Sequence, residues 1–245
     1  MLLRRITQHV KEQNWFAVLL DFLIVVAGIL IAFQITNWNE ELQQGNLEQS
    51  YLARMAADIE ENIEYLNLQD QRATEIKTVI ENFLAALNSG DSSDKDMIEA
   101  ITRYVSDGSE LQDFKVNRTT YDDLESAGNL KILKNKDLVQ LIGQLFTDFA
   151  DHDLDSLVNT DWIMPFESKI TIDFDFMRFD QRIQHLFPTK TSADIADHIR
   201  EHRVLLQRHA ALHYWYVDAI SDDYRSAVKQ AKFVLDSINT ELEEF

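Results

Sequence analysis

An unbroken apolar run near the N-terminus constrains this 245-residue chain more than any other feature. Residues 16–33 read FAVLLDFLIVVAGILIAF, and Asp21 is the one charged side chain among them. As a helix rising ~1.5 Å per residue, the run measures about 27 Å, close to the ~30 Å hydrocarbon core of a bilayer. Trp15 and Trp38 flank the run at the depth where indole rings prefer the membrane interface. The sequence therefore predicts a transmembrane helix over residues 15–38.

The charges that flank this run predict its orientation. The basic residues before the run are Arg4, Arg5 and Lys11. After the run only acidic charges occur until Arg54. Because Lys and Arg concentrate on the cytoplasmic side of membrane helices, we expect residues 1–14 to form a basic cytoplasmic segment. The acidic residue within the run and the lack of a small-x-small site after it favour an uncleaved anchor over a signal peptide. In a bacterium, residues 47–245 would then lie on the periplasmic side of the inner membrane.

One face of the predicted span combines small and acidic side chains. On a helical wheel this face groups five residues: Ala17, Asp21, Val25, Gly28 and Ala32. A carboxylate in hydrocarbon costs roughly 2.5 to 3.5 kcal/mol, so Asp21 is expected to face protein or water. The small residues Gly28 and Ala32 are spaced to let two helices approach closely. We therefore predict self-association, or docking onto a membrane protein, through this face. Alternatively, Asp21 reaches the headgroups or couples to an ion.

The rest of the chain is predicted to be all-α. It contains 6 Gly and 2 Pro, which are too few to punctuate many strands. Apolar residues recur every three or four positions from Leu47 to Leu87 and from Ile195 to Leu242, a pattern typical of long amphipathic helices. Helices at the two ends of a domain can pair antiparallel. We therefore expect residues 47–245 to form an extracytoplasmic helical bundle, built on two long antiparallel helices with shorter helices between them.

Three local sequence signals refine this predicted fold. Gly45 and Asn46 are the first helix breakers after the span, so residues 39–46 are expected to form a hinge. Pro165 is expected to close a helical region, because proline interrupts helix hydrogen bonding. Apolar and polar residues alternate over residues 170–176, which allows a short strand.

Composition excludes several classes of function. The formal net charge of −19 argues against nucleic-acid binding, which depends on clustered Lys and Arg. At 45% hydrophobic residues the chain is too apolar for a disordered acidic tail. The absence of Cys excludes thiolate metal sites and Cys nucleophiles.

One group of histidines has the spacing of metal ligands: His198, His202, His209 and His213. On one continuous helix they share a face, and an i,i+4 His pair can chelate zinc or nickel. The outer two would lie about 22 Å apart, too far to bind one ion. A metal would need an acidic group from another helix, for instance near Asp148, Asp151 or His152. We favour core histidines that are hydrogen-bonded to acidic neighbours, with a pH-responsive contact or a metal site as alternatives. The sequence by itself assigns no metal and no cofactor.

Two stretches of the chain carry a family resemblance. The first comprises Asn14-Trp15, the run DFLIVVAG from Asp21 to Gly28, and Trp38-Asn39-Glu40. The second comprises Thr120-Tyr121, Leu124, Ser126, Gly128, Leu130, Leu133, Asn135 and Leu138. In these residues the chain resembles an uncharacterised bacterial single-pass membrane family, domain of unknown function family 6090. The resemblance implies an N-terminal anchor and a helical domain, and it brings no activity, ligand or catalytic residue.

These features predict a non-enzymatic membrane protein that acts through protein interaction, since no GxSxG or HExxH motif accompanies the span. Its expected partners are the lipid bilayer and either a second copy of the chain or another membrane protein. Three alternatives stay open. The first is an ion-motive-force-coupled transducer that uses Asp21 and is similar in layout to the stator subunits of flagellar and Tol-type machines. The second is a metal-dependent periplasmic enzyme that uses the histidines. The third is a sensor that relays through a partner.

Overall fold

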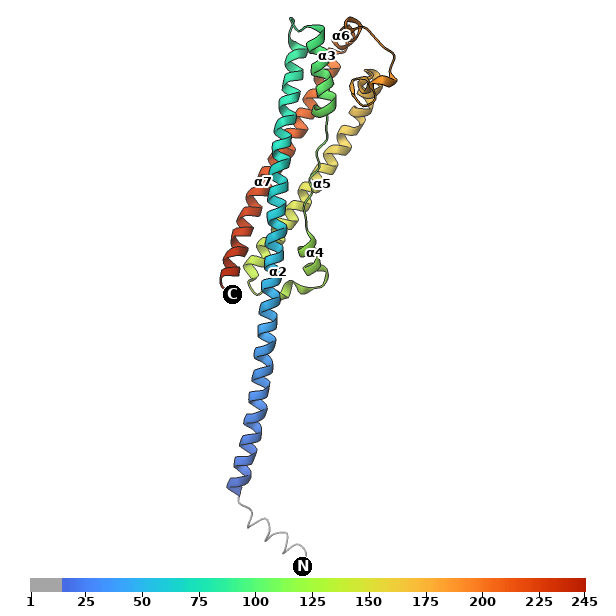
Figure 1. The fold of residues 1–245 in the computed structure, drawn as a ribbon. Helices are drawn as coiled ribbons and strands as arrows, with labels where there is room; N and C mark the ends of the chain where they lie inside the picture. Colours follow the sequence, from blue (N-terminus) through green and yellow to red (C-terminus); the bar gives the residue numbers. More distant parts are fainter. Residues whose placement is uncertain (1–14) are drawn as a thin grey trace, which may run out of the picture. The chain divides into compact units, whose positions relative to one another are not determined.

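A computed structural model describes residues 15–245, except for the side chains of residues 15–18 and 21 (Figure 1). Its six α-helices are α2 (Trp15–Asn88), α3 (Asp94–Arg103), α4 (Thr119–Ser126), α5 (Lys136–Asp173), α6 (Ser192–Glu201) and α7 (Arg203–Glu243). Short helical turns are η1 (Tyr104–Gly108), η2 (Asn129–Ile132), η3 (Phe176–Phe179) and η4 (Gln184–Leu186). No strand occurs within the described range, which confirms the predicted all-α class.

The described chain forms two compact units, of which the first ends at Ser50 and also includes Phe245. The single candidate membrane span found among the described residues, a helix long and apolar enough to cross a bilayer, begins in this unit at Phe22. Val25 and most of the other described apolar side chains of this span are exposed, whereas Val26 is partly buried. A Cβ added at Gly28 would meet nothing within 4 Å. Val25, Gly28 and Ala32 are therefore uncovered in the single chain. The predicted cytoplasmic segment and the side chains of Trp15, Ala17 and Asp21 lie outside the described residues.

Helix α2 is continuous through residues 39–46, where the sequence predicts a hinge. A glycine within a helix costs only about 0.5–1 kcal/mol relative to alanine. The residues around Gly45 are mostly good helix formers, so this cost does not end the helix. The prediction of a helix break at Gly45 and Asn46 is therefore wrong, and the second compact unit begins within α2, at Tyr51.

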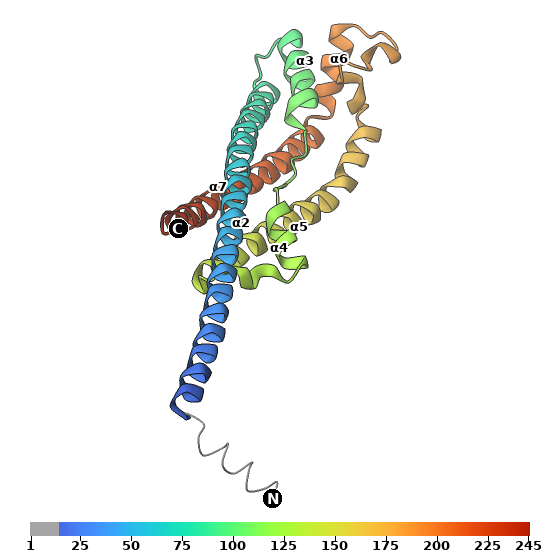
Figure 2. The same cartoon turned by 60° about the horizontal axis from the view of Figure 1, so that its bottom comes forward.

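Within the second unit, Tyr51–Glu244, α2 and α7 run antiparallel. Asp70 of α2 accepts a hydrogen bond from Arg225 of α7 at 2.9 Å. Further along α2, Lys77 pairs with Asp218 at 2.9 Å, and Glu81 accepts a hydrogen bond from Tyr214 at 3.0 Å. Residue numbers rise along one helix as they fall along the other, as the predicted antiparallel pair requires. Two views show α3 and α6 at one end of this unit and α4 toward the other (Figures 1 and 2).

A third long helix, α5, packs along α7 where the sequence predicts only shorter helices. It spans 38 residues and passes through Pro165, which was expected to end it. Proline inside a helix removes one hydrogen bond and costs about 3 kcal/mol or more. The helix nevertheless continues because Ile163 and Ile170, on either side of the proline, are both buried in the core. Burial of these two isoleucines offsets the free-energy cost of placing proline inside the helix.

The alternation over residues 170–176 does not form a strand. Ile170 and Phe174 lie one helical turn apart at the end of α5 and are both buried, whereas Ile172 between them is 80% exposed. Asp175 then takes a left-handed conformation, with φ of 63°, and redirects the chain so that Phe176 returns to the core. The period of two arises from a helix end followed by a turn.

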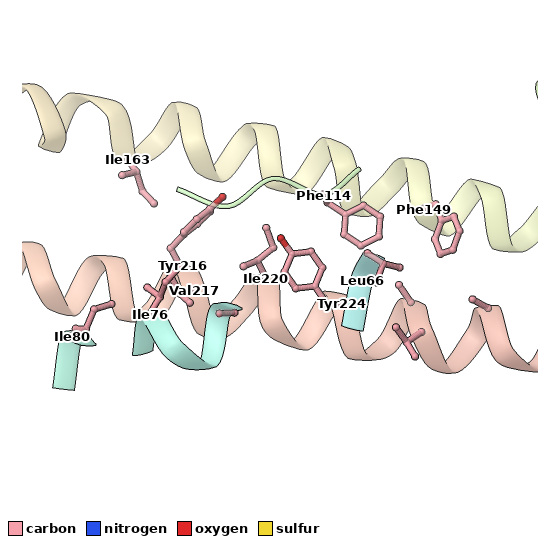
Figure 3. Close-up of a cluster of buried hydrophobic side chains, with 14 of the residues drawn as sticks. Leu66, Ile76, Ile80, Phe114, Phe149, Ile163, Tyr216, Val217, Ile220 and Tyr224 are labelled. Atoms are coloured by element: carbon pink, nitrogen blue, oxygen red, sulfur yellow. The ribbon is translucent and has the colours of Figure 1, made fainter. Parts of the chain in front are cut away.

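An irregular segment, residues 109–118, inserts Gln112 and Phe114 into the interior of the second unit, whereas Asp113 and Lys115 beside them are exposed. Its Phe114 is fully buried between Phe149 of α5 and Tyr224 of α7, with ring centroids 6.0 and 5.9 Å away (Figure 3). Backbone groups inside a protein must be hydrogen-bonded. The Tyr224 hydroxyl donates to the carbonyl of Asp113 at 2.7 Å, and the Tyr216 hydroxyl donates to that of Gln112. The tyrosines of α7 thus hold this segment in place.

The π-helical turn η1 packs tightly against its own tyrosine. A Cβ added at Gly108 would lie 2.6 Å from Cδ2 of Tyr104 and 3.1 Å from Cγ1 of Val79. The Tyr104 ring is fully buried and stacks on Phe83 with centroids 4.5 Å apart, so it has little room to move. This position therefore requires glycine for steric reasons.

We predict that Gly108→Ala destabilises the second unit by about 1–2 kcal/mol, because overpacking outweighs the better helix propensity of alanine. Gly143→Ala, in the middle of α5, is the matched control. Its nearest neighbour, the Tyr121 hydroxyl, would be 3.8 Å from the new Cβ. We expect this control to stabilise by about 0.5–1 kcal/mol. Urea unfolding of the full chain in detergent, followed by circular dichroism, measures both, and equal effects of the same sign would contradict the packing described for η1.

Candidate functional site

A buried carboxylate from α5 meets two histidines from α7. Oε1 of Glu167 lies 2.8 Å from Nε2 of His209 and 2.5 Å from Nε2 of His213. The histidines are one helical turn apart, so both rings point the same way, and both are buried. Their approach to one oxygen defines a polar cluster inside an apolar interior, which we call the Glu167 cluster.

Tyr104 of η1 extends the Glu167 cluster on its far side. Its hydroxyl lies 2.7 Å from Nδ1 of His209. An ionised carboxylate only accepts hydrogen bonds, so Nε2 of His209 donates to Glu167. In a neutral imidazole the other nitrogen then accepts, and the Tyr104 hydroxyl donates to it. A directed chain of hydrogen bonds therefore runs from Tyr104 through His209 to Glu167.

The surroundings set the charges of the Glu167 cluster. Burial by itself would raise the pKa of Glu167, but the hydrogen bonds from His209 and His213 outweigh it and lower this pKa to about 2. Burial lowers the pKa of His209 below its ordinary value, and the attraction of Glu167 only partly opposes this. At neutral pH the cluster therefore combines a carboxylate anion with a neutral His209. Nδ1 of His213 is buried without a hydrogen-bond partner in the described structure.

The four histidines form two separate pairs rather than one face of a single helix. Helix α6 ends at Glu201 and α7 begins at Arg203, so the helix is interrupted between the pairs. His198 stacks on Phe174 with ring centroids 5.0 Å apart, and its Nε2 donates to the carbonyl of Phe174 at 3.1 Å. Nδ1 of His202 donates to the carbonyl of His198 at 2.9 Å. Both histidines of this pair therefore hydrogen-bond to backbone carbonyls near the end of α6.

The acidic partner of the second pair is not among the residues that the sequence suggests. Asp148 accepts a hydrogen bond from Gln144, and His152 pairs with Asp223 at 3.1 Å. Glu167 lies further along α5 and reaches the histidines because α5 packs along α7 beyond Pro165. Sequence reasoning that ends the helix at the proline therefore misses this residue. Tyr104 is also missed, because no local pattern links η1 to α7.

An aromatic pocket opens beside the Glu167 cluster. Its volume is about 390 Å³, and His209 is among its lining residues together with Trp162, Phe166, Lys169 and Arg208. Trp162 contacts Trp215 of α7 edge-on, with centroids 5.6 Å apart, and both indoles are about half exposed. The pocket therefore borders one member of the Glu167 cluster, His209.

Helix α5 also exposes an apolar face that extends from this pocket. Its members are Leu154, Leu157, Val158, Trp162 and Phe166, and all of them are 47% to 58% exposed. Four of these residues recur at intervals of four, so they share one side of the helix. Contiguous apolar surface of this kind is typical of interaction sites.

Comparison with known proteins identifies no relative of this chain. No family model, no curated protein and no solved structure matches it. The resemblance noted in the two sequence stretches therefore stays a prediction, and function has to be argued from the geometry.

Two histidines are predicted to change the pH dependence of stability in opposite directions. His209 faces Glu167, His213 and Tyr104, and its folded pKa is below 6.5, so its contribution is present above that pH and is lost on acidification. A hydrogen bond to Asp223 raises the pKa of His152 above 6.5, so its contribution is present below that pH and is lost as pH rises through the raised value.

The free energy of unfolding should be measured from about one pH unit below to one unit above the ordinary histidine pKa. We expect His209→Gln to make stability rise less steeply with pH than in the wild type. His152→Gln should make it rise more steeply. Parallel profiles for the two variants would show that these hydrogen bonds do not control the titration.

Proposed function

We propose that this chain is a single-pass protein of the bacterial inner membrane that acts through protein interaction, as a homo-oligomer or as a subunit of a membrane complex. The observation that carries the proposal is the apolar surface that a single chain leaves exposed in both compact units. In the first unit this surface is the candidate span, which lipid would cover. In the second unit it is the exposed face of α5, which lipid does not explain when the unit lies outside the bilayer.

The charge distribution supports one orientation. The basic residues Arg4, Arg5 and Lys11 precede the span, whereas the chain after it is strongly acidic. Basic flanks stay in the cytoplasm, and long acidic domains cross the membrane readily. The N-terminus is therefore assigned to the cytoplasm and residues 51–244 to the periplasmic side.

Self-association is supported by the small face of the span. Val25, Gly28 and Ala32 are exposed, and Gly28 leaves room for a second backbone. Helices associate in lipid mainly through close packing of small residues, since apolar side chains gain little by leaving lipid. A second copy of the same helix is the simplest partner, because a two-fold axis places identical faces together.

The orientation can be tested with reporters fused behind Phe245. We expect a reporter that is active only outside the cytoplasm to be active, and one that fluoresces only in the cytoplasm to be dark. Changing Arg4, Arg5 and Lys11 to Glu should reduce the first signal, because the basic flank retains the N-terminus inside. Activity of the cytoplasmic reporter alone would refute the orientation.

The contact face of the span can be tested by disulfide crosslinking, because the chain has no Cys of its own. Cysteine introduced at Val25 or Gly28 should yield a crosslinked dimer in membranes. Cysteine at Leu23 or Leu30 is the matched control, since these residues are equally exposed in the single chain but lie on other faces. A crosslinked product of different mass would indicate a heteromeric complex. Equal products from all four positions would rule out a specific face.

A further inference from the structure

The Glu167 cluster has the arrangement of a metal centre. From this geometry we propose that Glu167, His209 and His213 bind a divalent transition-metal ion of the zinc type. The proposal is independent of the membrane function above, because it uses only side chains of the second compact unit. One ligand atom from each of the three residues lies within 4.8 Å of the other two.

The three ligand atoms already converge on a single point. Both Nε2 atoms approach the same oxygen of Glu167, at 2.8 and 2.5 Å. Zinc binds imidazole nitrogen and carboxylate oxygen at about 2.0–2.2 Å. Placing an ion between these atoms therefore requires the nitrogens and the oxygen to separate by only several tenths of an ångström. Two helices supply the ligands, so a small shift of α5 against α7 would provide this space.

Tyr104 would not bind the ion itself but would hydrogen-bond to its ligand His209. When Nε2 of His209 binds an ion, the ring proton is on Nδ1, and it would then donate to the Tyr104 hydroxyl 2.7 Å away. Metal-binding histidines commonly donate their second ring N–H to such a partner, which fixes the ring and its tautomer. The edge of Phe176 lies against the same ring, with centroids 5.2 Å apart. Tyr104 is therefore a positioning residue for His209.

A pocket borders one of the three proposed ligands, His209, and would be the route to an open side of the ion. Three protein ligands do not complete a tetrahedron, and sites that keep a fourth position open bind water or a further ligand there. The pocket of about 390 Å³ offers that access, and Lys169 and Arg208 line it. Lys169 already pairs with Asp173, so Arg208 is the cation that favours an anionic group as the additional ligand.

The second histidine pair is a weaker site, although Glu201 lies close to it. Nε2 of His198 and Nδ1 of His202 both donate to backbone carbonyls, so only the other nitrogen of each ring has a lone pair for an ion. Glu201 is exposed, and all three residues come from one short helix and its end. His198 and His202 therefore serve as the matched control pair.

The choice of zinc follows from the donor atoms. Two imidazoles and one carboxylate suit zinc and its neighbours in the first transition row, whereas magnesium and calcium prefer all-oxygen sites. The chain has no Cys, which excludes thiolate coordination. Cobalt(II) replaces zinc in such sites and reports its coordination number by its visible absorption.

The test uses the full chain in detergent, first treated with a chelator and then titrated with Zn²⁺ or Co²⁺. We expect one ion per chain with sub-micromolar affinity, and visible absorption of bound Co²⁺ that indicates four or five ligands. Weaker binding in the wild type, or only the pale spectrum of six-coordinate Co²⁺, would overturn the proposal. This measurement needs no variant.

Variants then locate the ion. Glu167→Gln keeps an oxygen that accepts from both histidines, and His213→Gln keeps a donor toward Glu167, so both should fold. Each should weaken binding at least 100-fold. His198→Gln and His202→Gln should change it less than threefold. Loss of binding in the control pair alone would place the ion at α6 and refute the assignment.

Tyr104→Phe tests the positioning role. It should weaken binding about 10-fold, as loss of a second-layer partner does, while one ion per chain is still bound. The energy of the Co²⁺ absorption band should also shift, which a purely structural role would not cause. An unchanged affinity and spectrum would remove Tyr104 from the site without removing the metal ligands.

Discussion

Polar groups buried between the three long helices are costly without a hydrogen-bond partner, and contacts that supply such partners recur through the second compact unit, with Nδ1 of His213 as an exception. An unpartnered buried donor or acceptor costs about 1–3 kcal/mol, which is a large part of the stability of a domain. Tyr216 and Tyr224 of α7 donate to carbonyls of the irregular segment 109–118, which allows Phe114 to be buried between α5 and α7. Tyr104 and Glu167 satisfy His209 in the same way. The apolar stripes bring the helices together, and these polar contacts determine how they are aligned.

The Glu167 cluster contains buried polar and charged groups that the packing of the helices does not require. A buried leucine or phenylalanine at each of its three positions would fill the space without any charge to satisfy. The cluster instead places a carboxylate between two imidazoles and beside a pocket that reaches the surface. The same stretch of α5 carries the exposed aromatic residues Trp162 and Phe166. The Glu167 cluster and the exposed apolar face of α5 thus lie next to each other in the second unit, so the proposed metal centre would adjoin the proposed contact face.

The spacing of apolar residues correctly predicted the long helices, but the local signals for their ends were wrong. Residues 47–87 and 195–242 repeat every three or four positions over many turns, so the helical period dominates local variation, and α2 and α7 pair antiparallel as expected. Gly45 and Pro165 are breakers by propensity, yet both lie inside helices. The alternation at residues 170–176 is a helix end and a turn. In each case a local signal worth at most a few kcal/mol was outweighed by helix-forming neighbours or by burial of flanking residues.

The sequence by itself determined the apolar run, the all-α class and the candidate role of the histidines, because composition and period are local properties of the chain. Only the tertiary structure divided the histidines into two pairs, because α6 ends at Glu201 and α7 begins at Arg203, and His198 of the first pair stacks on Phe174. Only the tertiary structure also brought Tyr104 and Glu167 to His209, across 105 and 42 residues of chain. Contacts between residues so far apart in the chain cannot be predicted from residue spacing in the sequence, because they depend on the register in which whole helices bury their apolar faces.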